Sequence, residues 1–129
     1  MSSPVEYLDL DDVIELARRL LGAKPPIRDV GLLAAAVARP QTTVGGQDAY
    51  ATIWSKAAAL LHSIVNNHAL VDGNERLGWL STAVFLEMND ASVATASNDA
   101  VYDLVVYVAA SNADIDDIAV RLKDLARAR

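Results

Sequence analysis

Apolar residues recur three or four positions apart along most of the chain, and this spacing predicts helices. The first helix is predicted from Asp9 to Leu21, between an aspartate N-cap and Gly22. After the turn Lys24-Pro25-Pro26, an alanine-rich helix is predicted from Asp29 to Arg39, because Pro40 stops it. Both helices therefore carry start and stop signals of their own.

Two longer helices follow. One is predicted from about Ala51 to Asn67, where apolar residues step by four, three and four positions along one face. His68 continues this stepping, so it is predicted at the helix end on the core side. The other helix, Asn74 to Met88, is apolar almost all round, which is typical of a central, surrounded helix. The stepping residues are Trp54, Ala58, Leu61 and Val65.

The remaining segments complete an all-α bundle of about six helices. Pro40 to Tyr50 contains two glycines and is predicted to be a loop or a short hairpin, and Ala91 to Ala96 is the one candidate for a further short strand. A fifth helix ends near Ala109, and a sixth reaches the C-terminus with Arg127 and Arg129 in its last turn, as the helix dipole favours. The candidate N-caps of these two helices are Ser97 or Asn98, and Asn112 or Asp114.

Composition narrows the class of protein. A chain of 129 residues with 53% hydrophobic residues predicts one globular domain over residues 1–129, not a disordered chain. The formal charge of −6 disfavours direct nucleic-acid binding, since phosphate backbones would be repelled. With no cysteine, the chain has no disulfide, thiolate nucleophile or cysteine-bound zinc.

The predicted location is the cytoplasm, without a membrane partner. The segment Met1 to Leu10 lacks the basic start and apolar stretch of a signal peptide. No apolar run approaches the ~20 residues that a membrane-spanning helix needs.

One stretch, His68 to Arg76, combines several groups that carry chemistry. The backbone N–H groups of Gly73, Asn74 and Glu75 lie at the start of a helix, where the dipole favours an anion. Glycine leaves room for a ligand, the Asn74 amide can donate a hydrogen bond, and Arg76 can bind a phosphate with its forked guanidinium. The sequence therefore predicts a phosphate site.

Two further residues suit a reaction at such a site. Asp72 is a hard oxygen ligand of the kind that Mg²⁺ takes together with phosphates and water. His68 is of the residue type that most often serves as a general base near neutral pH. Each residue also has a structural reading: a capping histidine, an aspartate-glycine turn before an N-cap, and a surface arginine. Their convergence within nine residues favours the functional reading.

The motif His-x-x-x-Asp-Gly-Asn-x-Arg, from His68 to Arg76, resembles the signature of the Fic/Doc family. Other segments resemble the Doc branch, the death-on-curing toxins of toxin–antitoxin systems, so the likeness covers nearly the whole chain. These segments are Tyr7 to Val13, Arg28 to Leu33, Ala38 to Gln41, and the pair Gly45-Gly46.

The resemblance implies a helical bundle with the signature loop between two central helices and a short flap, formed here by Pro40 to Tyr50, that aligns the target peptide. It also implies a kinase-like enzyme that uses ATP and Mg²⁺ to phosphorylate a threonine of elongation factor Tu, which arrests translation, and a Phd-like antitoxin as inhibitor. By position, His68 is the base, Asp72 binds Mg²⁺, and Gly73, Asn74, the residue at Glu75 and Arg76 hold phosphates.

Three positions depart from the family pattern. Leu70 replaces a phenylalanine, and Trp79 replaces the second arginine of adenylylating members, which favours phosphoryl over adenylyl transfer. Glu75 stands where Doc toxins have lysine. At about 5 Å and an effective dielectric of about 20, one charge pair is worth roughly 3 kcal/mol. Glu75 is therefore predicted to inactivate the chemistry while suiting a helix start.

Other functions stay open at this stage. An adenylyl transferase is one alternative, and a catalytically dead module that only binds antitoxin is another. A histidine–aspartate hydrolase is disfavoured, because His62 precedes serine and His68 precedes alanine; His62 is predicted to be structural. Ser2 and Glu6 have the spacing of an inhibitory helix motif, but Tyr7 breaks it. We therefore expect inhibition in trans, by an antitoxin helix in an apolar groove.

Overall fold

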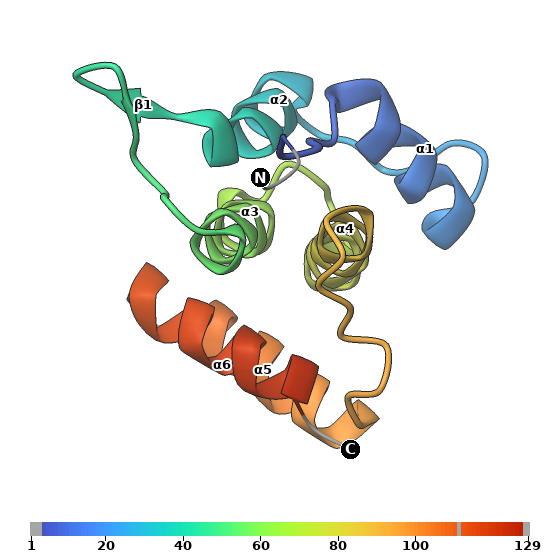
Figure 1. The fold of residues 1–129 in the computed structure, drawn as a ribbon. Coiled ribbons are helices and arrows are strands. Elements are labelled where there is room, and N and C mark those ends of the chain that lie inside the picture. The colour runs from blue at the N-terminus through green and yellow to red at the C-terminus, as the bar shows by residue number, and fades with distance from the viewer. Residues whose placement is uncertain (1–3, 111, 128–129) are drawn as a thin grey trace.

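A computed structural model describes residues 4–110 and 112–127 of the chain. The described residues form six α-helices in three layers, with α3 and α4 in the middle, α1 and α2 on one side, and α5 and α6 on the other (Figure 1). The helices are α1 (Leu10–Leu21), α2 (Val30–Ala38), α3 (Ile53–Asn67), α4 (Asn74–Met88), α5 (Asn98–Ala110) and α6 (Ile115–Arg127). The predicted all-α bundle is thus confirmed.

Local capping explains most of the helix boundaries. The Asp9 side chain accepts a hydrogen bond from the Asp12 N–H, the Asp12 side chain accepts one from the Asp9 N–H, and Gly22 ends α1 as predicted. Asp29 caps α2, which passes into a short 3₁₀ helix, η1 (Arg39–Gln41). α3 begins two residues later than predicted, because Thr52 and Ser55 form its capping box.

The central layer depends on small residues between α3 and α4. A Cβ on Gly78 would lie 2.8 Å from Val65 Cγ2, so only glycine allows this approach of the two helices. The outer side of α4 differs from the prediction of a surrounded helix: Trp79 and Val84 are only half-buried, and Met88 is 38% exposed. The neighbours of α4 are α1, α3 and α5, and they cover the rest of its surface. The apolar surface of α4 is therefore larger than the area that these helices bury.

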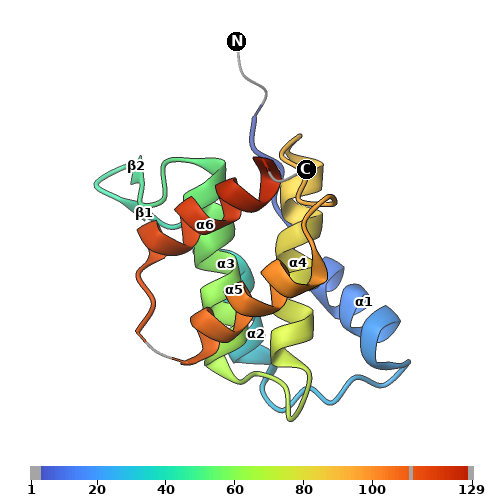
Figure 2. The same cartoon turned by 90° about the horizontal axis from the view of Figure 1, so that it is seen from below.

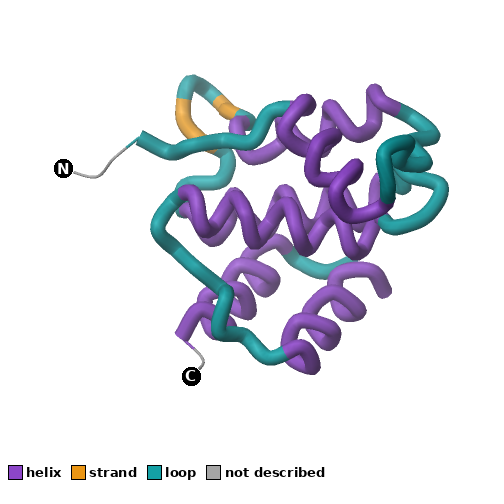
Figure 3. The backbone as a smooth tube through the Cα atoms, turned by 90° about the vertical axis from the view of Figure 1, so that its right-hand side faces the viewer, coloured by secondary structure: helices purple, strands orange, loops and turns teal. Residues whose placement is uncertain are grey.

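The segment Pro40–Tyr50 contains the predicted hairpin, with β1 (Thr43–Val44) paired antiparallel to β2 (Gln47–Asp48). It lies beside the N-terminal end of α3, whereas the α3–α4 connection lies at the opposite end (Figures 2 and 3). The 15 residues of α3 span about 22 Å. The hairpin therefore does not lie where a flap over the signature loop would be.

The predicted strand at Ala91–Ala96 is wrong. These residues form an irregular connection with a turn, in which the Ala96 N–H donates to the Val93 carbonyl. Val93 is buried in the core, and no neighbouring strand offers its backbone a partner in the described part of the chain. Ser97, not Asn98, caps α5, through a hydrogen bond from the Ala100 N–H.

Two sequence-based observations lie outside the described residues: those on Ser2 and on Arg129. Within residues 4–110 and 112–127, every helix is too short or too polar to cross a bilayer.

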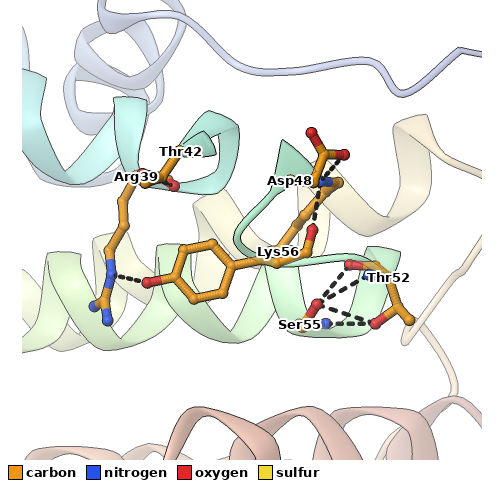
Figure 4. A network of polar contacts seen from close by, with 7 residues as sticks. Arg39, Thr42, Asp48, Thr52, Ser55 and Lys56 are labelled. Atoms are coloured by element: carbon orange, nitrogen blue, oxygen red, sulfur yellow. Dashed lines mark hydrogen bonds and ion pairs between the residues drawn. The ribbon is translucent and has the colours of Figure 1, made fainter. Parts of the chain in front are cut away.

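Two cations, buried Lys56 and half-buried Arg39, hold the base of the hairpin (Figure 4). Lys56 is 1% exposed, and its Nζ donates to Asp48 Oδ2 at 3.0 Å and to the Tyr50 carbonyl at 2.6 Å. Arg39 donates from Nε to the Tyr50 hydroxyl at 2.8 Å. The residues before and after the hairpin are therefore both tied to the bundle.

The same arginine reaches further along α3. Its Nη1 lies 2.8 Å from Ser63 Oγ and 3.0 Å from His62 Nδ1. Burial, and secondly the charge of Arg39, lower the pKa of His62 below its usual value, so the neutral imidazole is favoured. Arg39 and its partners Tyr50, His62 and Ser63 form the hairpin anchor. His62 is part of it, in line with its predicted structural role.

Candidate active site

The loop between α3 and α4 is held against the segment that precedes α2. The Ala69 carbonyl accepts hydrogen bonds from the N–H groups of Arg28 at 2.8 Å and Asp29 at 3.0 Å. Next to it, Leu70 forms an isolated antiparallel bridge with Ile27. Ala69 and Leu70 are each 2% exposed, so this edge of the loop belongs to the core.

His68 ends α3 in a left-handed backbone conformation, with φ 53° and ψ 43°. Helix ends of this kind usually carry glycine, which has no Cβ to be strained there, or asparagine, whose short polar side chain can hydrogen-bond locally. The side chain is exposed, which corrects the prediction that it lies on the core side. The left-handed turn takes His68 off the apolar face whose spacing it continues, and the imidazole lines an open pocket.

Gly73 stands directly before α4 and has φ 90°. A Cβ there would meet the two terminal methyl carbons of Leu21 at 2.9 Å. Glycine is therefore required by the backbone conformation and by the end of α1 packed against it. This requirement comes in addition to the space for a ligand that the sequence suggests.

Asn74 clamps the loop. Its Oδ1 accepts from the Leu70 N–H and its Nδ2 donates to the Leu70 carbonyl, both at 3.0 Å. The amide expected to face a phosphate thus uses one of its two N–H donors to fix the loop. Leu70, in the place of the family's phenylalanine, is the buried residue that this clamp holds.

The six predicted site residues come together around one open pocket of about 310 Å³. Asp72 is exposed, and one of its carboxylate oxygens accepts from the Gly73 N–H at 2.9 Å. Glu75 and Arg76 are exposed, and neither has a hydrogen bond or ion pair to another described side chain. The pocket residues are Val65, His68, Val71, Asp72, Gly73, Asn74, Glu75 and Arg76.

This arrangement suits an anionic ligand held by backbone and arginine beside a base. The first N–H groups of α4 have no partner within the helix, and the residues that carry them, Asn74 to Arg76, line this pocket. No three metal-binding side chains gather anywhere in the described residues. A cation at Asp72 would thus need ligand oxygens besides those of the protein, which is the usual way that Mg²⁺ binds with phosphates.

Some residues near the pocket were not predicted. Val65 and Val71 form apolar walls, and Val71 is 72% exposed, but an isolated valine gives no signal in the sequence. Arg28 contacts the loop through its guanidinium, which donates to the His68 carbonyl. Conversely, no residue of the hairpin segment Pro40–Tyr50 lines the pocket, and neither does Trp79.

Comparison with known proteins agrees with the fold. The model of the Fic/DOC family matches residues 7–86, a range that includes α1 to α3 and the whole signature loop. The chain belongs to this family.

A relative within the family is a protein named Toxin Doc from Mycolicibacterium smegmatis. It is 48% identical over 124 residues, which make up 95% of this chain and 95% of the relative. The chain is therefore a homologue of a toxin over nearly its full given length.

Proposed function

We propose that this chain is the toxin of a toxin–antitoxin pair, with the fold of an enzyme that transfers phosphate from ATP to a threonine of elongation factor Tu in the cytoplasm. The observation that carries the proposal is the pocket itself. It brings a base, a carboxylate and an arginine to the N-terminus of a helix. Family membership and the homologous Toxin Doc support the same reading.

In this proposal His68 takes the proton from the target hydroxyl as the threonine oxygen attacks. Its ring is exposed at the pocket and bonded to no other described side chain, so it is accessible to a substrate. Asp72 would hold Mg²⁺, and Arg76 with the first N–H groups of α4 would hold the phosphates. When bound, ATP supplies the phosphoryl group and Mg²⁺ offsets the charge of its phosphates.

Glu75 opposes this chemistry in the chain as it stands. Its exposed carboxylate lines the phosphate pocket, and no described cation compensates its charge. Replacing it by lysine changes the charge at the pocket by two units. We infer that Glu75 weakens ATP use and that Glu75→Lys restores it.

The experiment is transfer of label from ATP to elongation factor Tu, with the label at the γ- or the α-phosphate. We expect γ-label transfer by the Glu75→Lys variant and much less by the unsubstituted chain. Glu87→Lys is the matched control, because it makes the same change at an exposed site near the other end of α4. If the unsubstituted chain were as fast as Glu75→Lys, the inactivating role of Glu75 would be excluded.

The same experiment decides between the alternatives. Transfer of α-label would assign adenylyl transfer instead. Trp79 argues against it, since this residue stands in place of the second arginine of adenylylating members and lies outside the pocket. If Glu75→Lys transfers neither label but still binds antitoxin, the chain is a binding module.

For the antitoxin we propose a Phd-like protein whose helix binds an apolar groove. A groove of about 300 Å³ between α1 and α4 suits such a helix, because Leu16, Val84 and Met88 line it. Binding should show a negative heat-capacity change by calorimetry, and Val84→Asp should abolish it. Tight binding by Val84→Asp would place the antitoxin elsewhere.

A further inference from the structure

His68 is held in its left-handed conformation by a segment about 40 residues earlier in the chain. The Arg28 guanidinium donates a hydrogen bond to the His68 carbonyl. The next carbonyl, that of Ala69, accepts from the N–H groups of Arg28 and Asp29. Two consecutive carbonyls of the signature loop are therefore fixed by the residues just before α2.

The ends of the first two helices are closed locally instead. At α1, the Gly22 N–H donates to the Arg18 carbonyl at 2.9 Å. At α2, the Arg39 N–H donates to the Ala36 carbonyl. The end of α3 thus depends on a side chain from a distant segment, whereas the ends of α1 and α2 depend on hydrogen bonds within their own backbone.

A left-handed conformation costs a residue with a Cβ about 1–2 kcal/mol, so it persists only where surrounding contacts impose it. The His68 ring has no hydrogen bond to another described side chain that could set its direction. The backbone at His68 must therefore determine where the imidazole points. The Arg28 guanidinium is the side chain that donates a hydrogen bond to the backbone of His68.

We propose that Arg28 is a positioning residue for His68: it fixes the backbone that aims the imidazole into the pocket. The proposal rests on the proposed role of His68 as the base. Arg28 does not line the pocket, and it is exposed, so its removal leaves no cavity in the core. Its loss should therefore act on the rate of transfer and leave nucleotide affinity and the fold in place.

The first test observes the two imidazoles by NMR and needs no activity. The chain has two histidines, and His62 lies in the hairpin anchor, so it serves as an internal reference. In Arg28→Ala, the ring signals of His68 should broaden or move toward those of an unstructured histidine, while those of His62 stay in place. Arg28→Lys keeps one donor and should give an intermediate result.

The second test measures kinetics in the Glu75→Lys background. Adding Arg28→Ala should lower kcat by about 10- to 100-fold, as a misplaced catalytic group does, with the KM for ATP within about twofold. Arg19→Ala is the matched control, since Arg19 is an exposed arginine whose contact is with Glu15 on α1. It should change neither constant.

The outcomes separate this proposal from the proposed function. Unchanged His68 signals in Arg28→Ala would overturn the positioning role, whatever the activity. Equal changes at both histidines, with loss of helical circular dichroism, would also overturn it by making Arg28 a general support of the fold. If Glu75→Lys has no activity, the proposed function fails, but a selective change at His68 still supports the positioning role.

Discussion

Charged side chains are paired along α3 next to the hairpin, whereas they are exposed beyond the C-terminal end of that helix. Near the N-terminal end, Lys56 is almost fully buried and makes two polar contacts. Half-buried Arg39 extends this network from Tyr50 along α3 to His62 and Ser63. At the C-terminal end, Asp72, Glu75 and Arg76 are exposed around a pocket. A structural network thus lies along α3 from the hairpin, whereas the loop and the start of α4 beyond the C-terminal end of α3 leave charges available to a ligand.

Because of this difference, the residues that stabilise the bundle are not those that are available for chemistry. Groups that are paired and desolvated stabilise a single arrangement and have little left to offer a substrate. Groups at the open end contribute little to folding, and His68 in its strained conformation opposes it. Substitutions at the two ends should therefore change different measured quantities.

The largest effect is expected at His68. In the Glu75→Lys background, His68→Gly should lower phosphoryl transfer by about 10²–10⁴-fold, the contribution of a general base. The same change should raise the free energy of unfolding by about 1 kcal/mol, because glycine relieves the left-handed strain. Transfer rates and urea unfolding measure the two quantities.

Asp90 supplies the control, since it is the other described non-glycine residue with positive φ, at 60°. Asp90→Gly should give a similar gain in stability and leave transfer unchanged. A His68→Gly variant that is destabilised, or that still transfers phosphate at full rate, would contradict the assignment of His68 to chemistry.

The next effect concerns Arg39 in the structural network along α3. Arg39→Met removes hydrogen bonds to Tyr50, His62 and Ser63, and we expect a loss of about 2–4 kcal/mol in the free energy of unfolding. ATP affinity of the Glu75→Lys chain should not change. Arg18→Met, on the exposed face of α1, should alter stability by no more than about 0.5 kcal/mol. Equal effects of the two substitutions would remove the contrast between the ends.

A smaller effect is expected at Gly73, which both packs against Leu21 and lines the pocket. Gly73→Ala places a Cβ 2.9 Å from the Leu21 methyl carbons at φ 90°, and we expect a loss of about 1–3 kcal/mol in unfolding free energy. Adding Leu21→Ala should make the two changes less costly than their sum, because the clash is shared. Strict additivity in this double-mutant cycle would show that Leu21 does not constrain Gly73.

Much of the fold could be predicted, because the signals are local. Asp9, Asp29 and Gly22 mark helix ends through contacts within a few residues, and the apolar spacing then identifies the buried faces. Six of the eight pocket residues could also be named, since the chemistry-bearing ones all lie within the segment from His68 to Arg76.

What could not be predicted depends on contacts between distant segments. The sequence gives no sign that Arg28 meets the carbonyl of His68, or that the hairpin lies at the far end of α3. His68 continues the apolar spacing of α3, yet its left-handed backbone takes it off that face. Periodicity describes a helix only as far as the helix continues.

The smallest effect expected is a dependence of stability on pH that comes from His62. Burial, and after it the neighbouring Arg39, lower the pKa of His62 in the folded protein below the usual 6.5 of the unfolded chain. Between these two values the unfolded chain binds more protons, so the stability that His62 contributes is full above about pH 6.5 and falls as the pH drops toward the folded pKa. His62→Asn keeps a group that can accept from Arg39 but does not titrate, so this part of the decline between pH 7.5 and 5 should vanish from urea unfolding curves. His68→Asn is the matched control, because it removes the histidine that does not contact Arg39, and the decline should persist in that variant. If the decline disappears with His68→Asn and remains with His62→Asn, the pH-sensitive group is His68 beside the pocket, and the Arg39 network does not resist protonation.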